Sequence, residues 1–191
     1  MIVMTYQGVG KTTLCEGERL SSSFREFIDF ESGLFKRENG TRCEDWASTY
    51  VKCAESLSKQ GFTPLISSHS VVQMALNSVK EPVLSIFPSK NLKDQWISKL
   101  RKRWIESKSD KDYRAYINAA TGFDDQIDIL RCSPFEKIEI EDMDYKLWDL
   151  IWAHKLKMSF DRQKKRDKLE NEWDISHSRD ENRDPIEEET E

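Results

Sequence analysis

Residues 8–13 read Gly-Val-Gly-Lys-Thr-Thr, and these residue types at this spacing suit the binding of a polyphosphate. Backbone amides surround an anion only where the chain curls closely, and glycines lack the Cβ atoms that would obstruct such a curl. A helix beginning near Lys11 would direct its positive end at the same anion. We expect Lys11 to contact the β- and γ-phosphates of a nucleotide and the Thr12 hydroxyl to bind Mg²⁺. The predicted nucleotide-binding residues are Gly8, Val9, Gly10, Lys11, Thr12 and Thr13.

The sequence on either side of this stretch supports the prediction. An apolar run at Ile2–Thr5 precedes it and a helical pattern at Lys11–Arg19 follows it, which is the context of a P-loop, G-x-x-x-x-G-K-[ST]. Thr5 stands at the position of the first glycine of that pattern, whereas Gly10 and the two residues after it match. The alternative is an ordinary glycine-rich turn between a strand and a helix.

The elements that must position this loop alternate between strand and helix. Short apolar runs of strand type lie at Ile2–Thr5, Phe27–Phe30, Thr63–Ser67, Val83–Phe87 and Lys137–Ile140. Helical patterns lie at Lys11–Arg19, Glu44–Lys59, Val71–Ser78, Leu92–Glu106, Asp110–Ala120, Asp124–Leu130 and Asp144–Leu169. Such alternation predicts an α/β fold, in which helices cover both faces of a five-stranded parallel sheet to make a three-layer sandwich with a long C-terminal helix.

Polar side chains are predicted to meet at one edge of that sheet, because the carboxyl ends of parallel strands lie together. We expect Asp29, after the second strand, to hold Mg²⁺ or to accept a proton during phosphoryl transfer. The predicted acceptor-binding residues are Glu31 and Ser32 after the second strand and Ser68 and His69 after the third. The alternatives are a cap or a surface ion pair for Asp29, and a surface or capping role for His69.

The loop and these polar clusters together resemble the nucleoside- and nucleotide-kinase group of P-loop proteins. The resemblance covers about residues 1–152 in element order and is most specific at residues 8–13. It is similar in particular to small nucleotide-kinase-like proteins of bacteriophages, which have Ile-Asp-x-Glu-Ser after the second strand and Ser-Ser-His after the third. It is more distantly similar to adenylate and deoxynucleoside monophosphate kinases. The resemblance implies the strand order 2-3-1-4-5, ATP and Mg²⁺, and a lid that brings arginines onto the transferred phosphoryl group.

The helical pattern at Leu92–Glu106 is the candidate for that arginine-bearing element. It contains Arg101 and Arg103, and arginine suits phosphate because it stays charged and binds oxygens in a fork. The two residues point to different sides of a helix, so only one of them would cover the transferred group. The alternative is a solvated helix face whose apolar stems lie along the surface. Residues 107–134 would form a lid or specificity insert.

The charge distribution separates a body from a tail. The 191 residues carry a formal net charge of −5, but ten acidic and two basic residues fall between positions 170 and 191, so residues 1–169 carry +3. We expect one domain over residues 1–173 and an acidic disordered tail over residues 174–191. The sequence contains no signal-peptide pattern and no apolar run of about 20 residues, which predicts a cytoplasmic protein, in the host cytoplasm if a phage encodes it.

These features predict an ATP- and Mg²⁺-dependent kinase that acts on a nucleoside monophosphate or a related nucleotide or nucleoside. Two alternatives stay open. The mildly basic body and the basic run at Lys155–Lys168 suit a polynucleotide or modified-base DNA as the phosphoryl acceptor. The absence of the first glycine suits a non-catalytic regulator that binds a nucleotide without turnover.

Overall fold

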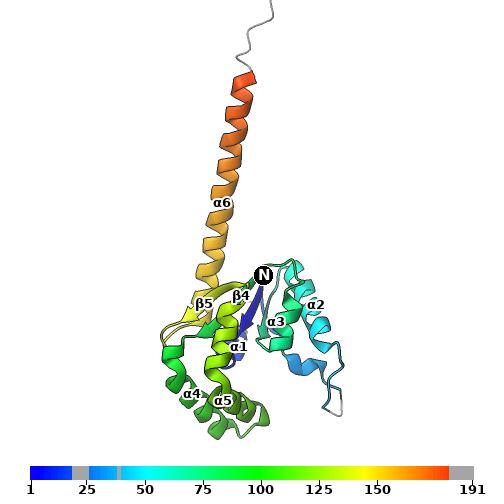
Figure 1. Ribbon diagram of the computed structural model, residues 1–191, viewed down its shortest axis with the longest axis vertical. Helices are drawn as coiled ribbons and strands as arrows, with labels where there is room; N and C mark the ends of the chain where they lie inside the picture. Colours follow the sequence, from blue (N-terminus) through cyan, green and yellow to red (C-terminus); the bar gives the residue numbers. More distant parts are fainter. Residues whose placement is uncertain (19–25, 38–39, 181–191) are drawn as a thin grey trace, which may run out of the picture. The chain divides into compact units, whose positions relative to one another are not determined.

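The fold is built on five parallel strands in the order β2-β3-β1-β4-β5, as seen in the computed structural model (Figure 1). The structure describes residues 1–18, 26–37 and 40–180, and for residues 174–180 it describes the backbone alone. The strands are β1 (Ile2–Thr5), β2 (Phe27–Asp29), β3 (Thr63–Ser67), β4 (Val83–Pro88) and β5 (Glu136–Ile140). The predicted all-parallel sheet and its strand order are therefore confirmed.

β1 occupies the centre of the sheet and its side chains lie in the core. It pairs with β3 on one side, where Val3 faces Leu65, and with β4 on the other, where Val3 faces Leu84. All four residues of β1 are at most 1% exposed. This burial on both faces is typical of a central parallel strand, and it explains why the segment is a continuous apolar run and not an alternating one.

Helices connect the strands and cover the sheet. They are α1 (Lys11–Glu18), α2 (Trp46–Lys59), α3 (Ser70–Leu76), α4 (Lys93–Ser107), α5 (Asp110–Cys132) and α6 (Leu147–Asp180), with short 3₁₀ turns η2 (Ser32–Phe35) and η3 (Lys90–Leu92). Crossovers between parallel strands are right-handed as a rule. The step from β1 to β2 runs one way across the sheet and every later step runs the other way. The rule therefore assigns α1 to one face and the next four helices to the opposite face.

The largest departure from the predicted elements lies between β4 and β5. The sequence predicted separate helices at Asp110–Ala120 and Asp124–Leu130, whereas α5 runs through both. Gly122 has a non-helical backbone within α5, with φ of −142° and ψ of 21°, so the helix kinks where the sequence predicted a gap. The predicted insert at residues 107–134 thus consists of the end of α4, a short turn and this kinked helix.

The chain divides into two compact units, Met1–Leu147 and Trp148–Glu191, where the sequence predicted one domain over residues 1–173. The described residues of the second unit belong to α6, which continues to Asp180 instead of ending near Leu169. The predicted disordered tail therefore overlaps this helix as far as Asp180, and residues 181–191 lie outside the described part of the chain. Across the described ranges, no helix is both long and apolar enough to cross a membrane.

Candidate functional site: a glycine loop at the ends of β1, β2 and β3

The glycine loop joins the central strand to α1 and curls in a way that only glycine adopts readily. Gly8 has φ of +84° and Gly10 has φ of +104°, both in the region that L side chains avoid. A Cβ on Gly10 would meet no atom within 4 Å, so the space next to this residue is open. The loop ends where Lys11 begins α1, and the first helical bond is donated by the Leu14 amide to the Gly10 carbonyl at 2.9 Å.

Several amides of this loop have no partner in the described part of the chain. Within the described residues, no hydrogen bond is donated by the amides of Gly8, Gly10, Lys11, Thr12 and Thr13. The first amides of any helix lack intrahelical acceptors and carry partial positive charge. An open curl of such amides at the start of a helix suits the binding of an anion.

The ammonium of Lys11 follows this loop, and no described residue forms an ion pair with it. Among the described residues, Lys11 makes no hydrogen bond and no ion pair through its side chain. Its pKa is lowered because the group is withdrawn from water, while the charges of Asp29 and Glu31 oppose that change and those of Lys111 and Arg103 add to it. A withdrawn, unpaired cation is costly unless a ligand supplies negative charge.

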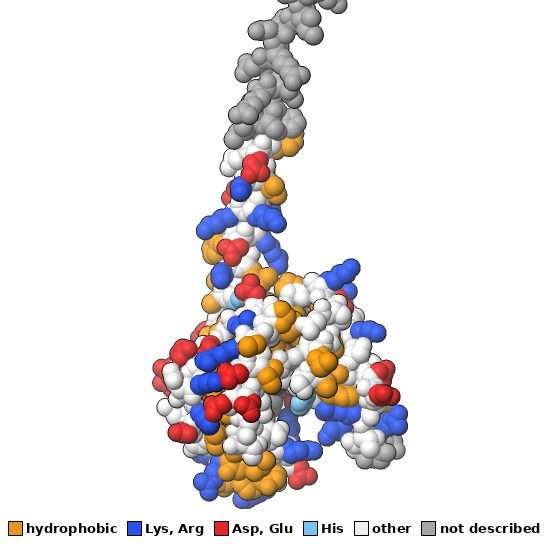
Figure 2. Space-filling model, viewed as in Figure 1, with side chains coloured by type: hydrophobic (Ala, Val, Ile, Leu, Met, Phe, Trp, Pro, Cys, Tyr) orange, Lys and Arg blue, Asp and Glu red, His pale blue; other side chains and the backbone are white. Residues whose placement is uncertain are grey.

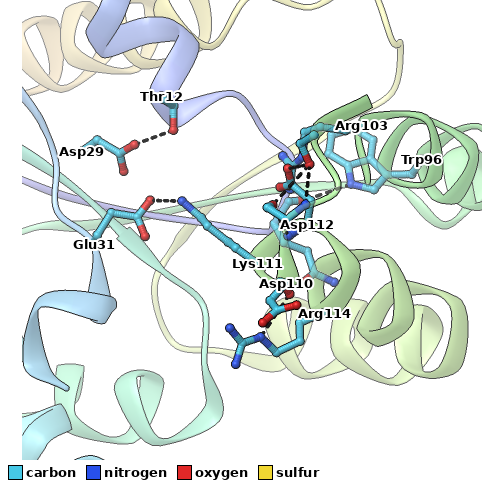
Figure 3. A network of polar contacts seen from close by, with 12 residues as sticks. Thr12, Asp29, Glu31, Trp96, Arg103, Asp110, Lys111, Asp112 and Arg114 are labelled. Carbon is cyan, nitrogen blue, oxygen red and sulfur yellow. Dashed lines mark hydrogen bonds and ion pairs between the residues drawn. The ribbon is translucent and has the colours of Figure 1, made fainter. Parts of the chain in front are cut away.

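Thr12 and Asp29 meet next to that ammonium, one from the first turn of α1 and the other from the end of β2 (Figure 3). The Thr12 hydroxyl donates a hydrogen bond of 2.7 Å to Oδ2 of Asp29. The other carboxylate oxygen, Oδ1, is buried and has no hydrogen-bond partner among the residues that the structure describes. An unsatisfied buried carboxylate oxygen beside a hydroxyl oxygen is a donor set that suits Mg²⁺.

The described side chains do not by themselves complete the coordination shell of a metal ion here. In the part of the chain that the structure describes, no three His, Cys, Asp or Glu side chains converge to hold a metal ion. Mg²⁺ in nucleotide sites takes one or two protein oxygens and completes its shell with phosphate and water. Thr12 and Asp29 fit that pattern and would need a polyphosphate to complete it.

Two cationic side chains from the α4–α5 region approach the same place. Lys111 of α5 reaches Glu31 at 2.6 Å, and Arg103 of α4 binds Asp112 at 2.8 Å (Figure 3). The Nε of Arg103 is buried without a partner, so this guanidinium has an unused donor. Arg101 is exposed on α4, and no contact within the described ranges joins it to this site.

A second polar cluster lies beyond Glu31, around the buried side chain of Ser32. Arg42 donates a hydrogen bond to Oγ of Ser32 at 3.0 Å, and Nε2 of His69 lies 3.5 Å from the same oxygen. The guanidinium of Arg42 also lies over the ring of Trp46, 3.9 Å from its centre, while its Nε is buried without a partner. Ser68 adjoins the cluster through the chain, and its carbonyl accepts a bond from Gln73.

The electrostatics connect this cluster to the glycine loop. The pKa of His69 is lowered by partial removal from water and then by the positive charges of Arg42 and Lys11. The pKa of Arg42 is lowered by burial and by the charge of Arg114. His69 therefore lies within the electrostatic fields of both Lys11 and Arg42.

The surface is hollowed in this region. Figure 2 shows a recess between the lobe that carries α4 and α5 and the lobe that carries α2, with Lys and Arg side chains at its rim. A hollow of about 210 Å³ opens beside the cluster and shares Trp46 with it. Its lining residues are Phe35, Lys36, Arg37, Cys43, Asp45, Trp46 and Thr49.

The structure brings together most of the residues that the sequence singled out. The glycine loop, Asp29, Glu31 and Arg103 surround Lys11, whereas Ser32 and His69 lie in the neighbouring cluster. Sequence reasoning missed Arg42, Trp46 and Lys111. Arg42 lies before α2, Trp46 is the first residue of α2, and Lys111 lies at the start of α5. Single residues at such places form no sequence pattern that indicates a site. The chain matches no protein-family model and no curated protein sequence.

Proposed function

We propose that this protein is an ATP- and Mg²⁺-dependent phosphotransferase that acts on a nucleoside monophosphate or a closely related nucleotide. The observation that carries the proposal is the half-buried side chain of Lys11, which has no ion-pair partner among the described residues and lies beside Thr12, Asp29 and loop amides that donate to no described acceptor. A Mg²⁺-bound triphosphate supplies negative charge for Lys11, hydrogen-bond acceptors for the loop amides and a cation for the Asp29 carboxylate.

The chain's own residues have distinct roles in the proposed reaction. The loop amides and Lys11 bind the β- and γ-phosphate oxygens and stabilise the charge that develops on them. Thr12 and Asp29 hold Mg²⁺, which when bound neutralises charge on those oxygens. An oxygen of the acceptor phosphate bonds to the γ-phosphorus while the bond from that phosphorus to the bridging oxygen breaks, and ADP leaves. Because a phosphate oxygen already carries negative charge, this acceptor needs no proton removed.

The acceptor would lie over the second polar cluster. Arg42 has a buried, unused Nε and its guanidinium is held in place by Ser32 and by the ring of Trp46. A fixed guanidinium with a free donor suits a phosphate group on the acceptor better than it suits a neutral sugar. Arg114 adds a second positive charge near Arg42, which favours an anionic acceptor further.

A steady-state assay with ATP, Mg²⁺ and a panel of acceptors tests the proposal. The panel holds nucleoside monophosphates, nucleosides, and oligonucleotides with and without modified bases. We expect the wild type to turn over with a monophosphate. Arg42→Ala should increase the KM for that acceptor and leave the KM for ATP unchanged. Lys102→Ala, on the exposed side of α4, is the control and should behave as wild type.

The same assay separates the rival functions. Turnover with an oligonucleotide and none with a mononucleotide would replace the proposed acceptor by a polynucleotide. Binding of ATP without turnover on any acceptor would identify a nucleotide-binding regulator. No binding of ATP, or equal binding by Lys11→Ala, would remove the proposed site altogether.

A further inference from the structure

Two aromatic side chains bind carbonyl groups of the glycine loop. Trp96 of α4 donates its indole N–H to the Gln7 carbonyl at 2.9 Å (Trp96 is drawn in Figure 3). Tyr145, after β5, donates its hydroxyl to the Val9 carbonyl at 2.8 Å. The two rings stack on one another, with centres 5.9 Å apart and planes 14° apart. Two residues from distant parts of the sequence, Trp96 and Tyr145, thus bind the carbonyls of Gln7 and Val9, which are two positions apart.

The helix that carries Trp96 lies directly against the loop. A Cβ on Gly8 would come within 2.8 Å of Cδ2 of Leu100 and 3.3 Å of the indole nitrogen of Trp96. Both side chains are at most 1% exposed, so neither has free space into which it could withdraw. The glycine at this position permits the close approach that the Trp96 hydrogen bond requires.

Because the peptide bond is planar, these two hydrogen bonds also fix the directions of the N–H groups that follow the two carbonyls. In a trans peptide the carbonyl of one residue and the N–H of the next point in opposite directions. Holding the Gln7 carbonyl toward Trp96 therefore directs the Gly8 N–H away from α4. Holding the Val9 carbonyl toward Tyr145 directs the Gly10 N–H away from Tyr145. Gly8 and Gly10 are two of the residues whose amides have no acceptor in the described protein.

Tyr145 is itself held as a donor. The Lys99 ammonium lies 3.3 Å from its hydroxyl oxygen and donates to it, and lies over the rings of Trp96 and Tyr145. Because lysine supplies only donors, the tyrosine proton is directed to the Val9 carbonyl. Burial raises the pKa of Tyr145, so its hydroxyl keeps that proton throughout the neutral range.

We propose that Trp96 and Tyr145 are positioning residues for nucleotide binding, which fix the loop carbonyls so that the Gly8 and Gly10 amides face the phosphates. The proposal rests on the anion site of the proposed function. In this proposal, side chains outside the loop order its backbone. The position of the first glycine in the P-loop pattern is occupied by Thr5 in this chain. The competing role for two stacked aromatic rings near a nucleotide is a platform for the base.

The probe that separates these roles is inorganic tripolyphosphate, because it has the phosphates of ATP and no base. Tyr145→Phe and Trp96→Phe keep a ring and remove one donor each. We expect both variants to bind tripolyphosphate and ATP more weakly by the same factor, roughly 3- to 10-fold for one lost hydrogen bond. Calorimetric titration measures the dissociation constants at a temperature where circular dichroism shows each variant folded.

Tyr113→Phe is the matched control. It removes a tyrosine hydroxyl that makes no hydrogen bond within the described residues, from a ring that is 44% exposed, and should leave both dissociation constants unchanged. Unchanged tripolyphosphate binding in Tyr145→Phe and Trp96→Phe would overturn the positioning role, and a loss confined to ATP would indicate a base platform. Failure of the proposed function looks different: wild type would then bind no tripolyphosphate, or Lys11→Ala would bind it equally well.

Discussion

The Thr12 hydroxyl donates a 2.7 Å hydrogen bond to Oδ2 of Asp29, which joins the first turn of α1 to the end of β2. Oδ1 of the same carboxylate is buried without a partner. Asp29→Asn keeps the size and an oxygen acceptor for Thr12 but removes the negative charge. We expect the Mg²⁺ concentration that gives half-maximal turnover to rise about 10- to 100-fold. Mg²⁺ titration of turnover checks this expectation.

The control for Asp29→Asn is Asp149→Asn, an exposed carboxylate in the second unit, which should titrate with Mg²⁺ as wild type does. An Asp29→Asn variant with an unchanged Mg²⁺ dependence would show that this carboxylate does not bind the metal.

Lys11→Met should separate ligand binding from stability. The ammonium of Lys11 is withdrawn from water and unpaired in the described protein, so its charge disfavours the folded state in the absence of a ligand. Replacing it by an uncharged chain of similar length should leave the melting temperature of the free protein equal or higher. The rise in melting temperature that ATP and Mg²⁺ produce in wild type should disappear. A free-state melting temperature well below that of wild type would contradict the assigned surroundings of Lys11.

The two loop glycines should differ when each is replaced by alanine. Gly10→Ala meets no atom but forces a side chain to φ of +104°, which costs about 1–2 kcal/mol. Gly8→Ala has the same kind of backbone cost and adds a contact of 2.8 Å with Leu100, so it should destabilise the protein more. Urea unfolding measures both changes.

Gly17→Ala is the matched control, because Gly17 lies inside α1 with ordinary φ and nothing near its Cβ position. It should stabilise the protein by roughly 0.5–1 kcal/mol, since alanine favours helix over glycine. If Gly8→Ala and Gly10→Ala were equally destabilising, the close contact between α4 and the loop would be wrong.

The titration of His69 should report on the anion site. Partial removal from water and the charges of Arg42 and Lys11 lower its pKa below the ordinary value of about 6.5. Because the folded-state pKa is lower than the unfolded one, stability is complete above that ordinary value. It falls as the pH drops through the window between the two. His69→Gln should lose this part of the pH dependence in melting curves recorded between about pH 5 and 8.

Tripolyphosphate should shift the same titration upward, because a bound anion offsets the charge of Lys11. Proton NMR follows the imidazole signal that is missing in His69→Gln. If saturating tripolyphosphate left the pKa of His69 unchanged, the second polar cluster would not be coupled electrostatically to an anion at the glycine loop.

Local patterns were enough to predict the sheet, because four of its strands are short, mainly apolar runs and β5 alternates charged residues with Ile138 and Ile140. β1 and β3 have the predicted bounds, and the other strands differ by one residue at one end. The kinked α5 was predicted as two helices because Gly122 interrupts the pattern, and the non-helical backbone of Gly122 marks the kink between its two parts. The curl of the glycine loop was predictable for the same reason, since it depends on consecutive residues.

The partners of that loop were not predictable, because they come from distant parts of the chain. Lys111 pairs with Glu31 across 80 positions, and Tyr145 reaches Val9 across 136 positions. Such contacts depend on how α4, α5 and the segment after β5 are placed against β1. A single sequence contains no spacing from which that placement follows. Of the two arginines that the sequence offered, Arg103 lies near Lys11, whereas Arg101 is exposed and makes no contact with the site among the described residues.

The central position of β1 has a consequence for motion. Its backbone is bonded to β3 on one side and β4 on the other, and its side chains are inaccessible to water. Amides in such a strand exchange with solvent only through large-scale opening, while edge elements fray far more often. The glycine loop is attached to this protected strand, so we expect its curl to persist through local fluctuations that loosen β2 or β5.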